Sequence, residues 1–293
     1  MIEAKNIIKL FGDLRAVDDV SFTVEDGEVL SIIGSSGSGK STLLRCVNRL
    51  ETPDSGEVYI DGELITDENL REVRTKTSMV FQNFNLFNNL DVTGNITVAP
   101  VNVLHRTKAE AEAKMMELLE LVGLSDKKDA YPHNLSGGQK QRVSIGAAVA
   151  SGARLLIFDE PTSSMDYFHM KETAALINAC RTADQLILII SHDFEFLTLV
   201  ADELLLMEKG TIASQSAFTT AQAEKMFEQL RVDEGRGYKE KEGLFLRTRQ
   251  SERPCRACRF FAAPSGRRSS RSGPPRAAFR VGRDPDDRHI AQR

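Results

Sequence analysis

The sequence predicts an α/β fold in which a mainly parallel sheet is covered by helices. Two continuous apolar runs, residues 155–158 and 186–190, have the length of strands and are separated by room for one average helix. A third apolar run, at residues 28–33, stops abruptly at a glycine. Strands that are apolar on both faces and alternate with helices are typical of a parallel sheet whose two faces are covered.

The other elements follow from turn residues and from hydrophobic spacing. We expect short strands at residues 7–11 and 20–24, a helix from Lys40 to Leu50, a return strand at 57–60 and a helix over 107–122. The apolar stripe of the last helix is assigned to the core, because such stripes more often pack than bind. No internal repeat is visible.

Composition excludes several classes of protein. No apolar run approaches the roughly 18 residues that a membrane-spanning helix needs, and the first ten residues lack the apolar core of a signal peptide. Four cysteines in 293 residues are too few for a secreted disulfide scaffold. We therefore expect a cytosolic protein.

Charge is distributed unevenly along the chain. The net charge is −4, but residues 251–293 hold eleven arginines against four carboxylates, so the remainder is clearly acidic. An acidic body disfavours general nucleic-acid binding, because phosphate contacts require a basic face. The basic segment also holds five of the nine prolines and no hydrophobic period, which predicts a disordered tail.

Three interpretations of this tail compete. Its arginines could bind anionic lipid or nucleic acid by charge alone. Cys255 and Cys258 could bind a metal ion, although a structural zinc site normally needs four ligands. We favour the third, that the segment adds nothing to function, because its Arg-, Pro-, Ala-, Gly- and Ser-rich composition resembles an unselected reading frame of GC-rich DNA.

A phosphate-binding loop is predicted where residues 34–42 match the pattern G-x-x-x-x-G-K-[ST], between a predicted strand and a predicted helix. Its residues are Gly34, Ser35, Ser36, Gly37, Ser38, Gly39, Lys40, Ser41 and Thr42. Glycines let backbone N–H groups converge on phosphate oxygens, and the helix N-terminus adds a favourable dipole. We expect Lys40 to reach the β- and γ-phosphates of ATP and Ser41 to ligate Mg²⁺. A flexible Gly/Ser loop is the structural alternative.

The second half of a nucleotide site is predicted at the end of the apolar run 155–158, which continues into Asp159 and Glu160. Asp159 is placed to hold Mg²⁺, and Glu160 is placed to polarise the attacking water. A strand that ends in Asp-Glu is weak evidence alone. It becomes strong after a phosphate-binding loop, because ligands collect at the carboxyl ends of parallel strands.

Residues 135–139, between these two halves, read Leu-Ser-Gly-Gly-Gln. A Ser-Gly-Gly stretch that opens a helix is a second anion-binding N-terminus, with the Ser136 hydroxyl and the amides of Gly137 and Gly138 as donors. A glycine loop before a surface helix is the structural alternative, but it gives Ser136 and Gln139 no task. We therefore predict that this stretch contacts phosphate.

With this stretch, the chain resembles the ATP-binding subunits of ABC transporters, whose signature motif is LSGGQ. Over about residues 1–215 the other motifs of that family follow in the usual order. The resemblance implies adenine stacking by Phe11, catalytic and Mg²⁺-binding roles for Gln82 of the Q-loop, a nucleotide-site role for Asp166 of the D-loop (residues 163–166), and a γ-phosphate contact by His192.

The resemblance also implies the organisation of the chain. We expect an ABC ATPase domain at residues 1–215, with a P-loop NTPase core, an antiparallel β subdomain and a helical signature subdomain at about residues 84–150. A C-terminal helical extension is expected at 216–250, followed by the tail at 251–293.

Partners are implied in the same way. The family works as a head-to-tail dimer, in which each signature faces the partner's phosphate-binding loop across ATP and Mg²⁺. The resemblance implies a homodimer bound to transmembrane permease subunits at the cytoplasmic face of the cell membrane. It further implies an indirect partnership with a solute-binding protein and no nucleic-acid partner.

Two parts of the chain are similar to different subfamilies. Residues 41–51 and 79–87 resemble importers of polar amino acids, whereas residues 144–152 and 164–170 are closer to energy-coupling-factor ATPases for vitamins or metal ions. We favour amino-acid import, because the Q-loop region faces the membrane partner in this family.

Departures from the importer pattern keep the alternative open. Most importers carry Arg where Ala147 stands and Pro where Tyr167 stands. An ABC ATPase of DNA repair or translation is less favoured. Such proteins usually have a long coiled-coil insertion or two fused ATPase domains, and this sequence shows neither.

Overall fold

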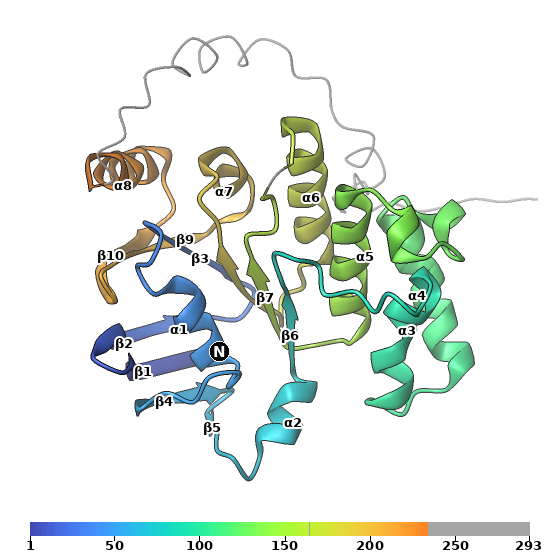
Figure 1. Cartoon of the computed structure of the whole chain (residues 1–293), viewed down its shortest axis with the longest axis horizontal. Helices are drawn as coiled ribbons and strands as arrows, with labels where there is room; N and C mark the ends of the chain where they lie inside the picture. Colours follow the sequence, from blue (N-terminus) through green and yellow to red (C-terminus); the bar gives the residue numbers. More distant parts are fainter. Residues whose placement is uncertain (164, 234–293) are drawn as a thin grey trace, which may run out of the picture. The chain divides into compact units, whose positions relative to one another are not determined.

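The computed structural model describes residues 1–163 and 165–233 (Figure 1). A four-stranded antiparallel sheet has the order β2-β1-β4-β5. Its strands are β1 (Ile2–Phe11), β2 (Leu14–Val24), β4 (Ser55–Ile60) and β5 (Glu63–Leu64). The two short strands predicted at 7–11 and 20–24 are therefore parts of one long hairpin, in which β1 pairs with β2 from Ile2 and Val24 to Phe11 and Leu14.

A six-stranded sheet has the order β10-β9-β3-β8-β7-β6 (Figure 1). All neighbours in it are parallel except β10 and β9. The strands are β3 (Val29–Gly34), β6 (Thr77–Val80), β7 (Leu155–Asp159), β8 (Leu186–Ile190), β9 (Glu203–Glu208) and β10 (Thr211–Ala217). The predicted α/β fold with a mainly parallel sheet is confirmed.

Helices connect these strands. They are α1 (Lys40–Val47), α2 (Leu70–Thr75), α3 (Val92–Asn102), α4 (Lys108–Leu121), α5 (Gly137–Ala150), α6 (Tyr167–Cys180), α7 (Phe194–Val200) and α8 (Thr220–Asp233), with short 3₁₀ turns at Ser125–Lys127 and Pro132–Asn134. The prediction that α1 runs to Leu50 is wrong. Arg49 takes a left-handed backbone, φ 55°, and Asn48 Oδ1 accepts the Leu50 amide, so the chain turns after Val47.

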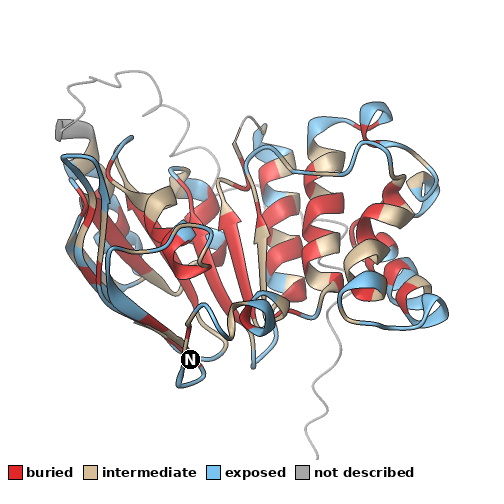
Figure 2. Cartoon of the chain, turned by 60° about the horizontal axis from the view of Figure 1, so that its bottom comes forward, coloured by how far each residue is buried: buried red, intermediate tan, exposed pale blue. Residues whose placement is uncertain are grey.

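Two apolar cores cover opposite faces of the six-stranded sheet. In Figure 2 the central strands of this sheet are coloured as buried. Along β8, Ile187 and Ile189 pack with α4 to α8, whereas Leu186, Leu188 and Ile190 pack with α1 and the antiparallel sheet. Both faces of the strand are thus removed from water, which explains its unbroken apolar sequence.

The predicted tail at 251–293, and residues 234–250 of the predicted extension, lie outside the described residues. The earlier part of that extension holds the end of β10 and helix α8. Within residues 1–163 and 165–233, no helix combines the length and the apolarity needed to cross a membrane.

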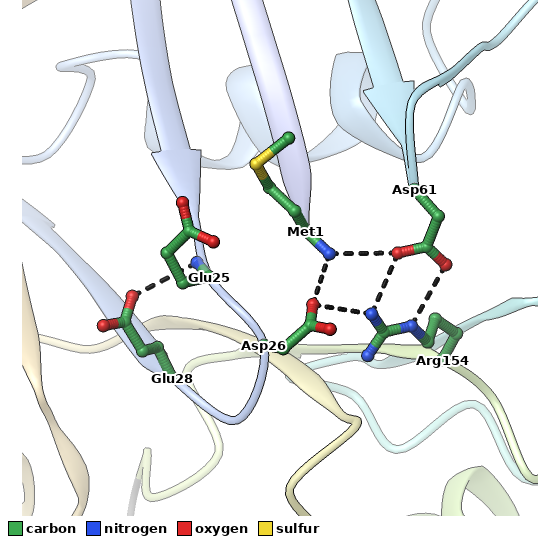
Figure 3. Close-up of polar contacts among 6 residues, drawn as sticks. All are labelled: Met1, Glu25, Asp26, Glu28, Asp61 and Arg154. Atoms are coloured by element: carbon green, nitrogen blue, oxygen red, sulfur yellow. Dashed lines mark hydrogen bonds and ion pairs between the residues drawn. The ribbon is translucent and has the colours of Figure 1, made fainter.

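One arginine connects the parallel sheet to turns of the N-terminal region (Figure 3). Arg154 precedes β7, and its Nη2 lies 2.6 Å from Asp26 and 2.9 Å from Asp61, while its Nε donates to Asp61 at 3.1 Å. The amino group of Met1 contacts the same two carboxylates. The Met1 amino group and Arg154 lower the pKa of Asp26, and Arg154 chiefly lowers that of Asp61.

We expect Arg154→Met to lower the free energy of unfolding by about 1 kcal/mol at pH 7, because the charged centre of this network is lost. Urea denaturation measures the change. The two carboxylate pKa values are depressed in the folded state, so the difference from wild type should shrink as the pH falls below 3.8, their ordinary value. Lys114→Met, which removes an exposed pair with Glu117, is the control and should change stability little. An equal effect in both variants would contradict a special role for Arg154.

Candidate active site

The predicted site segments follow four neighbouring parallel strands. In the order β3-β8-β7-β6, the strands lead into the phosphate-binding loop, His192, Asp159 with Glu160, and Gln82. Because parallel strands end at the same edge of a sheet, these segments, far apart in sequence, meet along one edge.

The phosphate-binding loop has the backbone that its glycines permit. Gly39, the N-cap of α1, is left-handed with φ 100°, and a Cβ on it would lie 2.1 Å from the Ala16 carbonyl oxygen. A Cβ on Gly34 would similarly lie 2.3 Å from the carbonyl oxygen of Met207. Glycine is therefore required at both positions by close approach of the neighbouring backbone.

Lys40 holds its ammonium group inside this loop. Its Nζ donates to the carbonyl oxygens of Gly34 at 2.8 Å and Ser35 at 2.7 Å, and to Ser38 Oγ at 3.3 Å. A cation in the middle of a loop that begins a helix makes a concentrated positive site, which suits the phosphates of a nucleotide.

Asp159 and Ser41 lie together at the ends of β7 and the loop. Ser41 Oγ is 3.5 Å from Asp159 Oδ1. Burial chiefly raises the pKa of Asp159, and the neighbouring Glu160 carboxylate adds to this, while Arg45, Ser41 and Lys40 oppose it. A partly buried carboxylate beside a hydroxyl is a donor set that suits Mg²⁺.

Glu160 and His192 form the second pair of the site. The Glu160 side chain is only 15% exposed, and its Oε2 lies 2.8 Å from His192 Nδ1. The backbone of Glu160 has φ 52°, a left-handed value that is rare outside glycine, and its amide donates to Ile190 at 2.9 Å. The contact with Glu160 raises the pKa of His192 above 6.5.

Gln82 lies exposed in the turn after β6, and the segment that follows it is attached to the helices. Ser144 Oγ of α5 donates to the Phe84 carbonyl oxygen at 3.1 Å. The buried Asn95 of α3 accepts the Phe87 amide at 2.7 Å and donates to the carbonyl oxygens of Phe87 and Leu90. The Q-loop is therefore fixed to α3 and α5.

The signature residues have a structural task, which corrects one step of the sequence argument. Ser136 Oγ accepts the Gln139 amide at 3.3 Å, and Gln139 Oε1 accepts the Ser136 amide at 2.9 Å, a complete capping box at the start of α5. The expectation that Ser136 and Gln139 have no role without phosphate is wrong.

The two signature glycines, in contrast, are not required by their own chain. Neither has a positive φ. A Cβ on Gly137 would lie 4.0 Å from Phe84, and one on Gly138 would lie 3.4 Å from His169, both ordinary contacts. The helices that follow the two motifs lie apart: α5, which begins at the signature, packs in one core, and α1, which begins at the phosphate-binding loop, packs in the other (Figure 1).

Asp166 is the N-cap of α6. Its carboxylate accepts the His169 amide at 2.9 Å and lies 2.8 Å from His169 Nδ1. The backbone hydrogen bond from His169 chiefly lowers the pKa of Asp166. Ser164 of the predicted D-loop lies outside the described residues.

Phe11 ends β1 and is 48% exposed. It pairs with Leu14, two residues before the Ala16 carbonyl that approaches Gly39. An exposed aromatic ring at this place has the chemistry needed to stack on a base.

Comparison with known proteins decides the family. The ABC transporter model matches residues 17–163. Glutamine transport ATP-binding protein GlnQ of Geobacillus stearothermophilus is 40% identical over 218 residues, which cover 74% of this chain and 90% of that protein. The chain belongs to the ABC transporter family.

Other members of the family are similar over the same region. Glutamate transport ATP-binding protein GluA of Corynebacterium glutamicum is 39% identical over 218 residues, which cover 74% of this chain and 90% of that protein. Methionine import ATP-binding protein MetN of Brucella abortus is 43% identical over 73% of this chain and 59% of its own length. The dimeric post-hydrolysis structure of the ATP-binding cassette MJ0796 with ADP and phosphate matches with a TM-score of 0.68 at 28% identity, over 75% of this chain and 99% of that one.

The chain is therefore an ABC ATPase, and the predicted family and enzymatic activity are confirmed. Sequence reasoning missed residues that support its site, notably Arg45, whose charge acts on Asp159, and His169, which holds Asp166. Arg45 lies four residues after Ser41, one helical turn along α1, so helical spacing was a usable signal.

We expect Glu160→Gln to lower ATP turnover by at least about 100-fold, because the carboxylate predicted to polarise the attacking water is removed while its shape is kept. The same change should bring the pKa of His192 back towards 6.5, since the contact that raises it is lost. In the wild type, the contact between Glu160 and His192 stabilises the folded protein at low pH. This stabilisation is lost as the pH rises through the raised pKa of His192. A phosphate-release assay and the NMR titration of the His192 ring measure the two effects.

Glu224→Gln, on the exposed face of α8, is the matched control and should change neither. Near-normal turnover of the Glu160→Gln variant would show that another group activates the water.

Proposed function

We propose that this ABC ATPase energises the uptake of a polar amino acid, acting as two copies that share two ATP molecules. The observation that carries the proposal is the meeting of the phosphate-binding loop, Asp159, Glu160 and His192 at one edge of the parallel sheet. The substrate class rests on the amino-acid transport relatives.

The chain's own residues supply the groups for hydrolysis. The amides of the phosphate-binding loop and Lys40 bind the phosphates and stabilise the charge of the transferring phosphoryl group. Glu160 accepts a proton from the attacking water. His192, held by Glu160, donates to the γ-phosphate, and the contact with Glu160 raises the pKa of His192, which favours the protonated ring that this role needs.

Mg²⁺ fits the same edge. The Ser41 hydroxyl and the Asp159 carboxylate already lie together, and both are oxygen ligands of the kind that Mg²⁺ prefers. Gln82 supplies a third oxygen in this proposal. When bound, the ion would neutralise part of the charge on the phosphates.

A second copy completes the site. The capping box uses the Gln139 amide, while the amides of Gly137 and Gly138 lie in the first turn of α5, where a helix offers no acceptor. Glycine is a weaker helix former than Ala, and nothing in the same chain requires it at these two positions. A phosphate from outside the chain explains both glycines, and the Ser136 hydroxyl, although it accepts from Gln139, can still donate its proton.

The Q-loop provides the route from hydrolysis to transport. A shift of Gln82 towards the nucleotide would pull the segment that Asn95 and Ser144 fix to α3 and α5. In this proposal the helices pass the movement to transmembrane permease subunits. The chain then works at the cytoplasmic face of the membrane, with a solute-binding protein as an indirect partner and no nucleic acid.

An energy-coupling-factor ATPase for vitamins or metal ions is the alternative. CbiO1 of Clostridium perfringens, part of the ABC transporter complex CbiONQ, matches with a TM-score of 0.70 at 26% identity, over 79% of this chain and 94% of that one. The amino-acid transport proteins are 39–41% identical, which favours amino-acid uptake.

The shared site predicts complementation between two inactive chains. A mixture of Lys40→Ala and Ser136→Arg chains should form dimers in which one site carries both lesions and the other is intact. We expect up to about a quarter of wild-type ATP turnover in an equal mixture, because half of the dimers are mixed and each has one intact site. A phosphate-release assay at several mixing ratios measures the recovery.

Thr107→Arg is the matched control for loss of a helix cap, because Thr107 closes an equivalent capping box on α4. It should leave turnover close to wild type. Activity of the mixture that never exceeds the sum of its two parents would contradict a site shared between chains.

The substrate class is tested in the source cells after disruption of the gene. We would measure the uptake of radiolabelled glutamine, glutamate, arginine and methionine. Uptake should fall for at least one of the three polar amino acids, which are glutamine, glutamate and arginine. Wild-type protein should restore uptake and Lys40→Ala should not, because its phosphate site lacks the cation. Loss confined to methionine would correct the substrate, and loss of vitamin or metal-ion uptake alone would establish the alternative.

A further inference from the structure

A largely buried lysine lies beside the proposed base-stacking ring. The Lys9 side chain is only 13% exposed, and its Nζ is 5.3 Å from the centroid of the Phe11 ring. This distance is within the range of a cation–π interaction. Lys9 Nζ also donates to the Thr52 carbonyl oxygen at 2.8 Å and lies 3.7 Å from Asp54 Oδ2.

The loop that contacts Lys9 is itself bound to β1. The Asp54 amide donates to the Ile8 carbonyl oxygen at 2.8 Å, and Asp54 Oδ2 accepts the Leu10 amide at 2.7 Å. The residues on either side of Lys9, Ile8 and Leu10, are thus both hydrogen-bonded to Asp54 of this loop. Since this loop follows α1, the tip of the β1–β2 hairpin and the C-terminal end of α1 form one connected unit.

The position of Lys9 leaves Phe11 suited to stacking. The ring is 48% exposed although an ammonium group lies against it. A cation draws electron density towards itself, so the opposite face of the ring repels the electrons of a stacked base less strongly. A fixed cation also reduces the freedom of the ring, which lowers the entropy cost of binding.

We propose that Lys9 is a positioning residue for the base of the bound nucleotide, which holds and polarises Phe11 so that a purine stacks on the ring's other face. The proposal rests on the proposed role of Phe11 in ATP binding. It assigns to Lys9 a contribution to affinity that depends on the base and not on the phosphates.

Inorganic tripolyphosphate separates these two contributions, because it offers the phosphates without a base. We would measure the dissociation constants of ATP and of tripolyphosphate by titration calorimetry without Mg²⁺, using the full chain. Lys9→Met should weaken ATP binding about threefold to fivefold and leave tripolyphosphate binding within about twofold of wild type. Lys9→Arg keeps a cation and should restore ATP affinity.

Lys5→Met is the matched control. Lys5 lies on the same strand, 4.5 Å from the centroid of the Tyr59 ring, and forms a similar cation–π pair away from Phe11. It should bind both ligands as the wild type does. Equal weakening of ATP and tripolyphosphate by Lys9→Met, or no weakening of either, would overturn the proposal.

The double variant keeps the test decisive. If Lys9 acts through Phe11, Lys9→Met should have no further effect on ATP affinity in a Phe11→Ala chain. A Lys9 effect that persists there overturns the proposal for Lys9 alone. If Phe11→Ala by itself leaves ATP affinity unchanged, the stacking role of Phe11 fails instead, so the two failures are distinguishable.

A fluorescence measurement gives a second readout. The chain contains no tryptophan, so Phe11→Trp introduces a single indole at this position. ATP should quench its emission and tripolyphosphate should not. Addition of Lys9→Met should raise the ATP concentration that gives half the quench, and an unchanged midpoint would contradict the proposal.

Discussion

Parallel pairing of β3, β8, β7 and β6 is the constraint on which the rest of the molecule depends. In register, Ile32 lies beside Ile190, Ile190 beside Asp159, and Phe158 beside Val80. A slip of one residue in any pair would send alternate side chains to the opposite face and shift one functional segment away from the others. At the start of β8, the Leu186 amide donates to the Arg154 carbonyl oxygen and the Ile187 amide donates to the Glu28 carbonyl oxygen, so the observed register begins at the first residues of the strand.

The parts of the fold and site that a sequence can reveal are those set by local chemistry. The run at 186–190 is a strand over those same residues, and the phosphate-binding loop lies between a strand and a helix as its pattern requires. The end of β7 at Asp159 could be predicted because the run of apolar residues in the sequence ends there. In each case the signal lies within a few neighbouring residues.

Other features depend on residues that are distant in the chain. Lys9 contacts Thr52 across 43 positions, and Arg154 contacts Asp61 across 93, and no spacing rule connects either pair. Helix α3 was missed for a different reason, since its apolar residues surround the helix and Pro100 lies inside it. The capping box of Ser136 and Gln139 has a recognised sequence pattern, but the phosphate interpretation of the same residues obscured it.

The backbone of Glu160 places function and folding in opposition. A left-handed conformation costs a non-glycine residue on the order of 1–3 kcal/mol when held in place by its surroundings. Glycine would relieve that strain but would delete the carboxylate. A lineage released from the need to hydrolyse ATP would therefore gain robustness by losing this side chain, and laboratory evolution for heat tolerance alone would favour the same loss. Selection for the ATP turnover that we propose for Glu160 would oppose that loss.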